Sequence, residues 1–73
     1  MKIKEKVENL IKKHAKLGND IDWIILSGLD FITLVFQMYN HIELNGIRIV
    51  SDESIQEGVA QVVDAKGIKD VQL

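Results

Sequence analysis

The chain has 73 residues, enough for one domain at most, and we expect residues 1–73 to form it. It contains no cysteine, which excludes disulfides and thiolate metal sites, and no apolar run approaches the roughly 18 residues of a membrane span, so we expect a cytoplasmic protein. Residues 1–16 carry a net charge of +4 and residues 17–73 carry −6, and this acidic balance outside one basic segment disfavours a nucleic-acid partner.

An amphipathic helix is the first predicted element, from about Lys2 to Leu17. Its lysines fall mostly on the polar side, and Gly18, Asn19 and Asp20 provide its end. We expect His14, at the edge of the apolar face, to be a partly buried structural residue rather than a metal ligand. Residues spaced by three and four positions make up that apolar face: Ile3, Val7, Leu10, Ile11, His14 and Leu17.

A strand is predicted next, over Ile21–Leu26. Its last four residues, from Trp23 to Leu26, are all apolar and leave no solvent-facing side. Such a run is typical of a strand that is covered on both faces, as in a parallel sheet.

The second predicted helix starts near Leu29 to Phe31, with Ser27 or Asp30 as its cap, and stops at Asn45 and Gly46. Its predicted inward face is widened by two further residues, and the whole set is Ile32, Val35, Phe36, Tyr39, Ile42, Leu34 and Met38. The β-branched run Ile47–Val50 then predicts a second strand, parallel to the first because the helix provides a long crossover.

A third helix is predicted from Ser54, whose spacing from Glu57 is that of a capping box, to about Lys66. Its inward face would consist of Ile55, Val59, Val62 and Val63. Gly67 would end it, and Ile68–Leu73 would add a third strand. The predicted fold class is therefore α/β, a small open parallel sheet with covering helices in α-β-α-β-α-β order.

No catalytic motif is recognisable. The sequence has no glycine-rich phosphate loop and no nucleophile elbow, and His14 and His41 are its only histidines. Asp20, Asp22 and Asp30 suggest a cation site, but we interpret them as turn and capping residues. We therefore expect no enzyme activity, no cofactor and no bound metal. The polar strand exit from Ser27 to Asp30 is the main candidate site, because ligands bind at the carboxyl ends of parallel strands.

The segment I-D-W-I-I-L-S-G-L-D-F-I resembles the central motif of STAS domains, the family of sulfate transporters and anti-sigma-factor antagonists. The later G-I-R-I-V and the segment I-Q-E-G-V-A-Q-V-V-D-A-K-G resemble the family's next strand and last helix. This resemblance implies a regulatory protein–protein interaction module.

The resemblance also implies a partner-binding surface made of Ser27, Gly28, Asp30 and Thr33. The family's antagonists carry a phosphorylated serine or threonine after Phe-Ile, and Thr33 is the residue that takes this place here. A phosphate on Thr33 would add about −1.5 to −2 charges at the start of the second helix. The usual Asp-Ser-(Ser/Thr)-Gly segment is missing, which weakens the case for a kinase-regulated switch.

Two other families share shorter stretches. S-G-L-D-F-I-T-L-V and S-I-Q-E-G-V resemble helices of acyl carrier proteins, although the modified serine would fall at Gly28. A third resemblance is to the acidic N-terminal region of primary sigma factors, whose last helix ends in a similar E-x-x-G-I-x-V-V pattern. The carrier resemblance implies a helical domain without a sheet.

We further expect self-association or an obligate partner. STAS domains usually begin with two strands that this sequence lacks before its first helix, which would leave a sheet edge free to recruit another chain. A core this small rarely contributes more than about 3–5 kcal/mol to the free energy of unfolding. The predicted homodimer would form edge to edge or through Leu34 and Met38.

Overall fold

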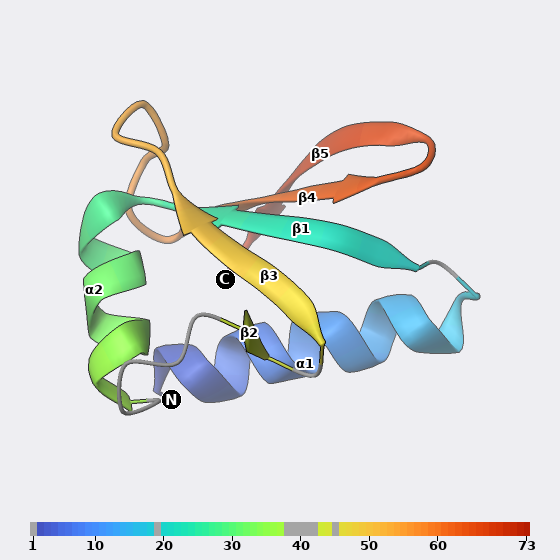
Figure 1. The fold of residues 1–73 in the computed structure, drawn as a ribbon, viewed down its shortest axis with the longest axis horizontal. Helices are drawn as coiled ribbons and strands as arrows, with labels where there is room; N and C mark the ends of the chain where they lie inside the picture. Colours follow the sequence, from blue (N-terminus) through green and yellow to red (C-terminus); the bar gives the residue numbers. More distant parts are fainter. Residues whose placement is uncertain (1, 19, 38–42, 45) are drawn as a thin grey trace.

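A computed structural model describes residues 2–18, 20–37, 43–44 and 46–73, and over these residues the chain forms two helices and five strands (Figure 1). The elements in chain order are α1 (Ile3–Lys16), β1 (Ile21–Leu26), α2 (Gly28–Gln37), β2 (Glu43–Leu44), β3 (Ile47–Ser51), β4 (Val59–Asp64) and β5 (Gly67–Gln72). The predicted α/β class is confirmed, whereas the predicted α-β-α-β-α-β order is not.

The strands form one mixed sheet in the order β2-β3-β1-β4-β5. The predicted parallel pairing of the first two long strands is confirmed, because β1 and β3 run parallel with Ile24 opposite Ile49. The other pairs, β1 with β4, β2 with β3 and β4 with β5, are antiparallel. The prediction of an entirely parallel sheet is therefore wrong.

α1 confirms the predicted first helix within one residue at each end. Ile3, Val7, Leu10, Ile11 and His14 are buried as expected. The Nδ1 atom of His14 lies 3.0 Å from the carbonyl oxygen of Leu10, which can only accept, so this nitrogen donates a hydrogen bond within the helix. Leu17 was expected on the same face but is exposed, because the helix ends at Lys16 and the chain turns away through Gly18, whose φ is +75°.

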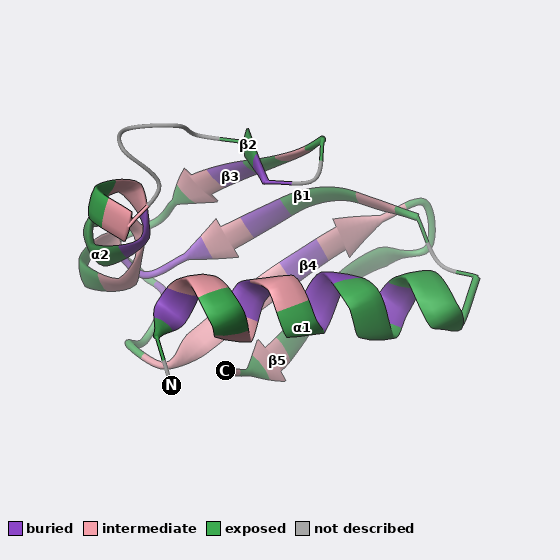
Figure 2. Cartoon of the chain, turned by 90° about the horizontal axis from the view of Figure 1, so that it is seen from below, coloured by how far each residue is buried: buried purple, intermediate pink, exposed green. Residues whose placement is uncertain are grey.

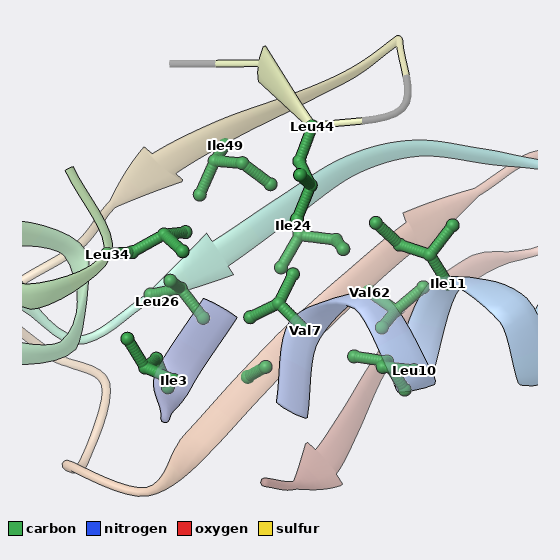
Figure 3. Packing of buried hydrophobic residues seen from close by; sticks show 11 residues of the cluster. Ile3, Val7, Leu10, Ile11, Ile24, Leu26, Leu34, Leu44, Ile49 and Val62 are labelled. Carbon is green, nitrogen blue, oxygen red and sulfur yellow. The ribbon is translucent and has the colours of Figure 1, made fainter. Parts of the chain in front are cut away.

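The core lies between α1 and one face of the sheet (Figure 2). Alternate residues of the central strands point into it, Ile24 and Leu26 from β1 and Ala60 and Val62 from β4. Figure 3 shows the apolar side chains of α1 directed toward this face. α2 closes one end of the sheet on the same side and adds Leu34 to the cluster.

The opposite face of the sheet is not covered by either helix (Figure 1). Trp23 and Ile25 of β1 point to it and remain partly exposed, as do Val50 of β3 and Val63 of β4. The prediction that the apolar run of β1 is covered on both faces is therefore wrong. We call this surface the open face, and it comprises Trp23, Ile25, Val50, Val63 and Ile68.

The predicted helix from Ser54 to Lys66 does not form. Residues 52–58 are a loop that Ile55 anchors as a buried residue, and residues 59–64 are β4. The Ser54 hydroxyl donates to Asp52 Oδ1 at 2.8 Å instead of capping a helix. Gly58 has a φ of +85°, which interrupts any helix there, and the β-branched valines that follow favour a strand paired with β1. β5 confirms the predicted third strand, but it is antiparallel to β4.

The second helix is shorter than predicted. α2 ends at Gln37, and the expected stop residue Gly46, with a φ of +79°, lies instead in the turn between β2 and β3. β2 and its pairing with β3 were not predicted. Several residues of the expected helix and its stop, together with a histidine, lie outside the described residues: Met38, Tyr39, His41, Ile42 and Asn45.

Candidate functional site

Ser27 is the N-cap of α2 and sits where β1 ends. Its Oγ accepts a hydrogen bond of 3.1 Å from the backbone N–H of Asp30, and its carbonyl accepts another from the Phe31 N–H at 2.9 Å. This is the usual arrangement of a capping serine, and it confirms Ser27 as one of the two predicted caps. Ser27 is buried, and both its hydroxyl and its carbonyl oxygen already accept hydrogen bonds. It therefore stabilises the start of α2 and is not accessible to a partner.

Asp30 connects the start of α2 to the loop before β4. One oxygen of its carboxylate, Oδ2, accepts a hydrogen bond of 2.8 Å from the backbone N–H of Gly58. The side chain is therefore committed to a contact between segments that are 28 positions apart in the sequence. Asp20 and Asp22 lie before or at the start of β1, whose six residues extend about 20 Å, so the three aspartates do not form a cation site.

Thr33 is exposed on the second turn of α2. Its hydroxyl donates to the Leu29 carbonyl oxygen at 2.9 Å. Since the helix begins at Gly28, Thr33 is the sixth helical residue and lies beyond the first turn, where the free backbone N–H groups are. The expectation that a phosphate on Thr33 would sit at the helix N-terminus is therefore wrong. Of the four predicted partner-binding residues, Ser27 caps α2, Gly28 and Asp30 lie in its first turn, and Thr33 alone is exposed.

Three apolar residues beside Thr33 form a surface that we call the α2 stripe: Leu29, Ile32 and Phe36. Their exposed fractions are 57%, 54% and 75%. They recur at spacings of three and four, which places them on one face of the helix. Ile32 and Phe36 were predicted to face inward and Leu34 to lie at a dimer surface, but Leu34 is only 1% exposed and belongs to the core.

Sequence patterns do not distinguish these faces because α2 is apolar nearly all round. Such a helix is normally buried. Here one side packs on the sheet, and the other has nothing against it among the described residues. The composition of α2 did indicate an unusually apolar helix, because its ten residues contain a single charged side chain, Asp30.

Two segments flank the ends of the α2 stripe, the loop of residues 52–58 and the start of α1 (Figure 1). Near its start lies the loop of residues 52–58, which is held by Asp30 and carries the exposed acids Asp52, Glu53 and Glu57. Near its end lies the start of α1, where the backbone N–H of Lys4 donates to Gln37 Oε1 at 2.9 Å. An open groove of about 510 Å³ is found at this end, lined by Lys2, Lys4, Glu5, Glu8, Phe36 and Gln37.

Asp52 organises the acidic loop. Its Oδ1 accepts hydrogen bonds from the Ser54 backbone N–H at 2.9 Å and from the Ser54 hydroxyl at 2.8 Å. Both bonds stabilise the charged carboxylate, so the pKa of Asp52 is lowered below its ordinary value. Asp52 therefore stays ionised to a lower pH than an ordinary aspartate.

The open face is the second apolar surface. Trp23 lies opposite Arg48 on β3 and opposite Val63 on β4, and Val63 in turn lies opposite Ile68 on β5. The Arg48 guanidinium carbon is 5.4 Å from the centroid of a Trp23 ring, within cation–π distance. The Arg48 side chain of the same molecule therefore already covers part of the Trp23 ring.

Among the residues that the structure describes, no three His, Cys, Asp or Glu side chains gather as they would around a metal ion. No helix there has the length and apolar character needed to cross a bilayer.

Comparison with known proteins yields no relative: no family model, curated protein or solved structure gives a significant match to this chain.

Proposed function

We propose that the chain is a non-enzymatic protein–protein interaction module, of the STAS-like regulatory type that its central segment resembles, and that it acts in the cytoplasm. The observation that carries this proposal is the α2 stripe: three large apolar side chains, each more than half exposed, on one face of one short helix. A contiguous apolar surface of this kind typically marks a site where another protein binds.

The position of the stripe supports the same reading. It begins at Leu29, within the capped turn of Ser27 to Asp30 at the strand exit, which is where the resemblance places partner binding. The segments that carry the resemblance, Ile21–Leu26 and Ile47–Ser51, are adjacent parallel strands joined through α2. The segment resembling the family's last helix is instead a loop and β4, so the STAS likeness is limited to the central part.

The alternatives from the sequence receive no such support. An acyl-carrier-like helical domain is incompatible with a five-stranded sheet. The E-x-x-G-I-x-V-V pattern of the sigma-factor likeness fits best at residues 43–50, which contain β2 and most of β3 rather than the end of a helix.

Site-specific photo-crosslinking in living cells tests the proposal. The full chain would carry a photoreactive phenylalanine analogue at Thr33, beside the stripe, or at Leu17, which is exposed but lies at the far end of α1. We expect a discrete adduct from position 33 that disappears when Ile32→Asp is added, and none from position 17. The absence of any adduct at position 33, or equal adducts at both positions, would refute the proposed function.

A further inference from the structure

We propose that an extended acidic segment of another protein binds along the outer edge of β5, as an additional strand of the sheet in the groove beside α1. This surface is separate from the α2 stripe, so the inference goes beyond the proposed function. Among the described residues, β5 pairs only with β4 and ends the sheet on its side. α1 lies over the β4–β5 side of the sheet (Figure 2).

The backbone of β5 presents hydrogen-bonding groups along this edge. In an antiparallel pair, residues that bond the neighbouring strand alternate with residues whose N–H and C=O point away from it. The Leu73 N–H donates to the Gly58 carbonyl oxygen at 2.9 Å, which assigns the odd-numbered residues of β5 to the bonded set. The N–H and C=O groups of Ile68, Asp70 and Gln72 therefore point outward, where a further strand can bond them.

A groove of about 260 Å³ lies between α1 and the end of β5. Leu10 of α1 and Val71 and Leu73 of β5 give it an apolar floor, since Leu10 is buried and the other two are half-buried. Side chains of a strand alternate between its two faces, so an extended chain added to β5 would place every second side chain over this floor. The groove therefore suits a strand rather than a helix.

The charges around the groove favour an acidic occupant. Lys6 and Lys13 line it on the α1 side, about 10 Å apart along the helix axis with Leu10 between them. Lys69 lies opposite the buried Val62, so its side chain is on the same face of the sheet as α1. No aspartate or glutamate is among the described residues that line this groove. Acidic side chains at the groove-facing positions of an incoming strand would complement these lysines.

A second copy of this chain fits the same edge poorly. Edge-to-edge dimerisation was predicted from the sequence, and β5 is the longer of the two edge strands. Two β5 strands paired antiparallel and centred on Lys69 or Asp70 would place two like charges directly opposite each other. Charges at the middle of an edge strand are a usual means of resisting self-pairing. Lys69 thus disfavours a second copy and attracts an acidic segment.

A peptide probe tests the proposed occupant. The probe is the acetylated, amidated and fluorescein-labelled peptide T-E-T-V-T-E-T, whose groove-facing residues would be glutamate, valine and glutamate. The control peptide T-K-T-V-T-K-T reverses its charges. We expect fluorescence anisotropy to show saturable binding of the probe to the full chain, and binding of the control peptide that is weaker by about 10-fold or more.

Two matched pairs of variants locate the site. Asp70→Pro removes an outward N–H without breaking a bond to β4 and should weaken binding by about 10-fold, whereas Asp70→Ala keeps this N–H and should bind at least as well as the wild type. Lys13→Glu should weaken binding by about 5-fold. Lys12→Glu makes the same charge change outside the groove and should alter binding little. Circular dichroism verifies that each variant is folded.

Several outcomes would overturn the inference: no saturable binding at submillimolar protein, equal binding of the two peptides, or equal effects within either pair of folded variants. A wild-type dimer in sedimentation velocity that Asp70→Pro dissociates would identify a second copy as the occupant and overturn it as well. Adduct formation at position 33 reports on the α2 stripe alone, so the proposed function and this inference can fail separately.

Discussion

The Asp30 carboxylate accepts a hydrogen bond of 2.8 Å from the backbone N–H of Gly58, and this contact joins the first turn of α2 to the loop that enters β4. Gly58 has a φ of +85°, a conformation that glycine adopts without strain. The Gly58 carbonyl also accepts from the Leu73 N–H at 2.9 Å. Gly58 therefore links three segments that are distant in sequence, and the role of Asp30 is to position this loop against α2.

Replacing Asp30 should lower stability. Asp30→Ala removes the acceptor for Gly58, and we expect the free energy of unfolding to fall by about 1–3 kcal/mol, as for other hydrogen bonds to charged groups. Asp30→Asn keeps an acceptor oxygen and should lose less. Urea unfolding followed by Trp23 fluorescence measures both variants, and equal losses in the two would show that the hydrogen bond is not the source of the effect.

Gly28 should tolerate a side chain. It is the first residue of α2, its φ is not positive, and a Cβ built on it has no heavy atom within 4 Å outside its own helix and chain neighbours. Gly28→Ala should therefore raise the free energy of unfolding by about 0.4–1 kcal/mol, mainly by restricting the unfolded chain. Thermal unfolding provides the measurement. A lower melting temperature would mean that this helix start is more tightly packed than described.

Leu34 and Ile32 should respond in opposite ways although both are apolar residues of one helix. Leu34→Ala creates a cavity in the core and should cost about 2–5 kcal/mol, which is comparable to the whole stability of so small a domain. Ile32→Ala removes mostly exposed surface and should change monomer stability little. Dilute samples examined by circular dichroism make this comparison, and a large loss for Ile32→Ala in the monomer would contradict the exposure of the α2 stripe.

Asp52 should contribute a pH-dependent part of the stability. Its pKa is lowered in the folded chain by the hydrogen bonds from Ser54, so folding is favoured when this carboxyl is ionised. The contribution should be fully present above the unfolded pKa and disappear as the pH falls through the lower folded value. Unfolding experiments from about pH 7 to about pH 3 should show a difference between wild type and Asp52→Asn that shrinks toward the acidic end. A difference independent of pH would argue against the charged interaction.

The sequence by itself determined those helices and strands in which the spacing of apolar residues agrees with the residues that are buried in the structure. α1 was predictable because its apolar residues follow a strict helical period and its end is marked by Gly18. β1 and β3 were predictable, including their parallel pairing, because an apolar β-branched run and a helical crossover leave few other arrangements. The Ser27 cap was also readable from residue type and position.

Only the tertiary structure decided the secondary structure of residues 54–66 and which side of α2 is exposed. Residues 54–66 contain both a capping-box spacing and β-branched valines, and pairing with the exposed edge of β1 selected the strand, while Asp52 engaged the Ser54 hydroxyl. The polar residues of α2, Asp30, Thr33 and Gln37, share one side and apolar residues occupy the rest, so the sequence does not say which of the apolar residues face the sheet. Packing at the end of the sheet buried Leu34 and left Leu29, Ile32 and Phe36 exposed. Only one layer of helices covers the sheet, so each helix has one face against the sheet and the other face outward.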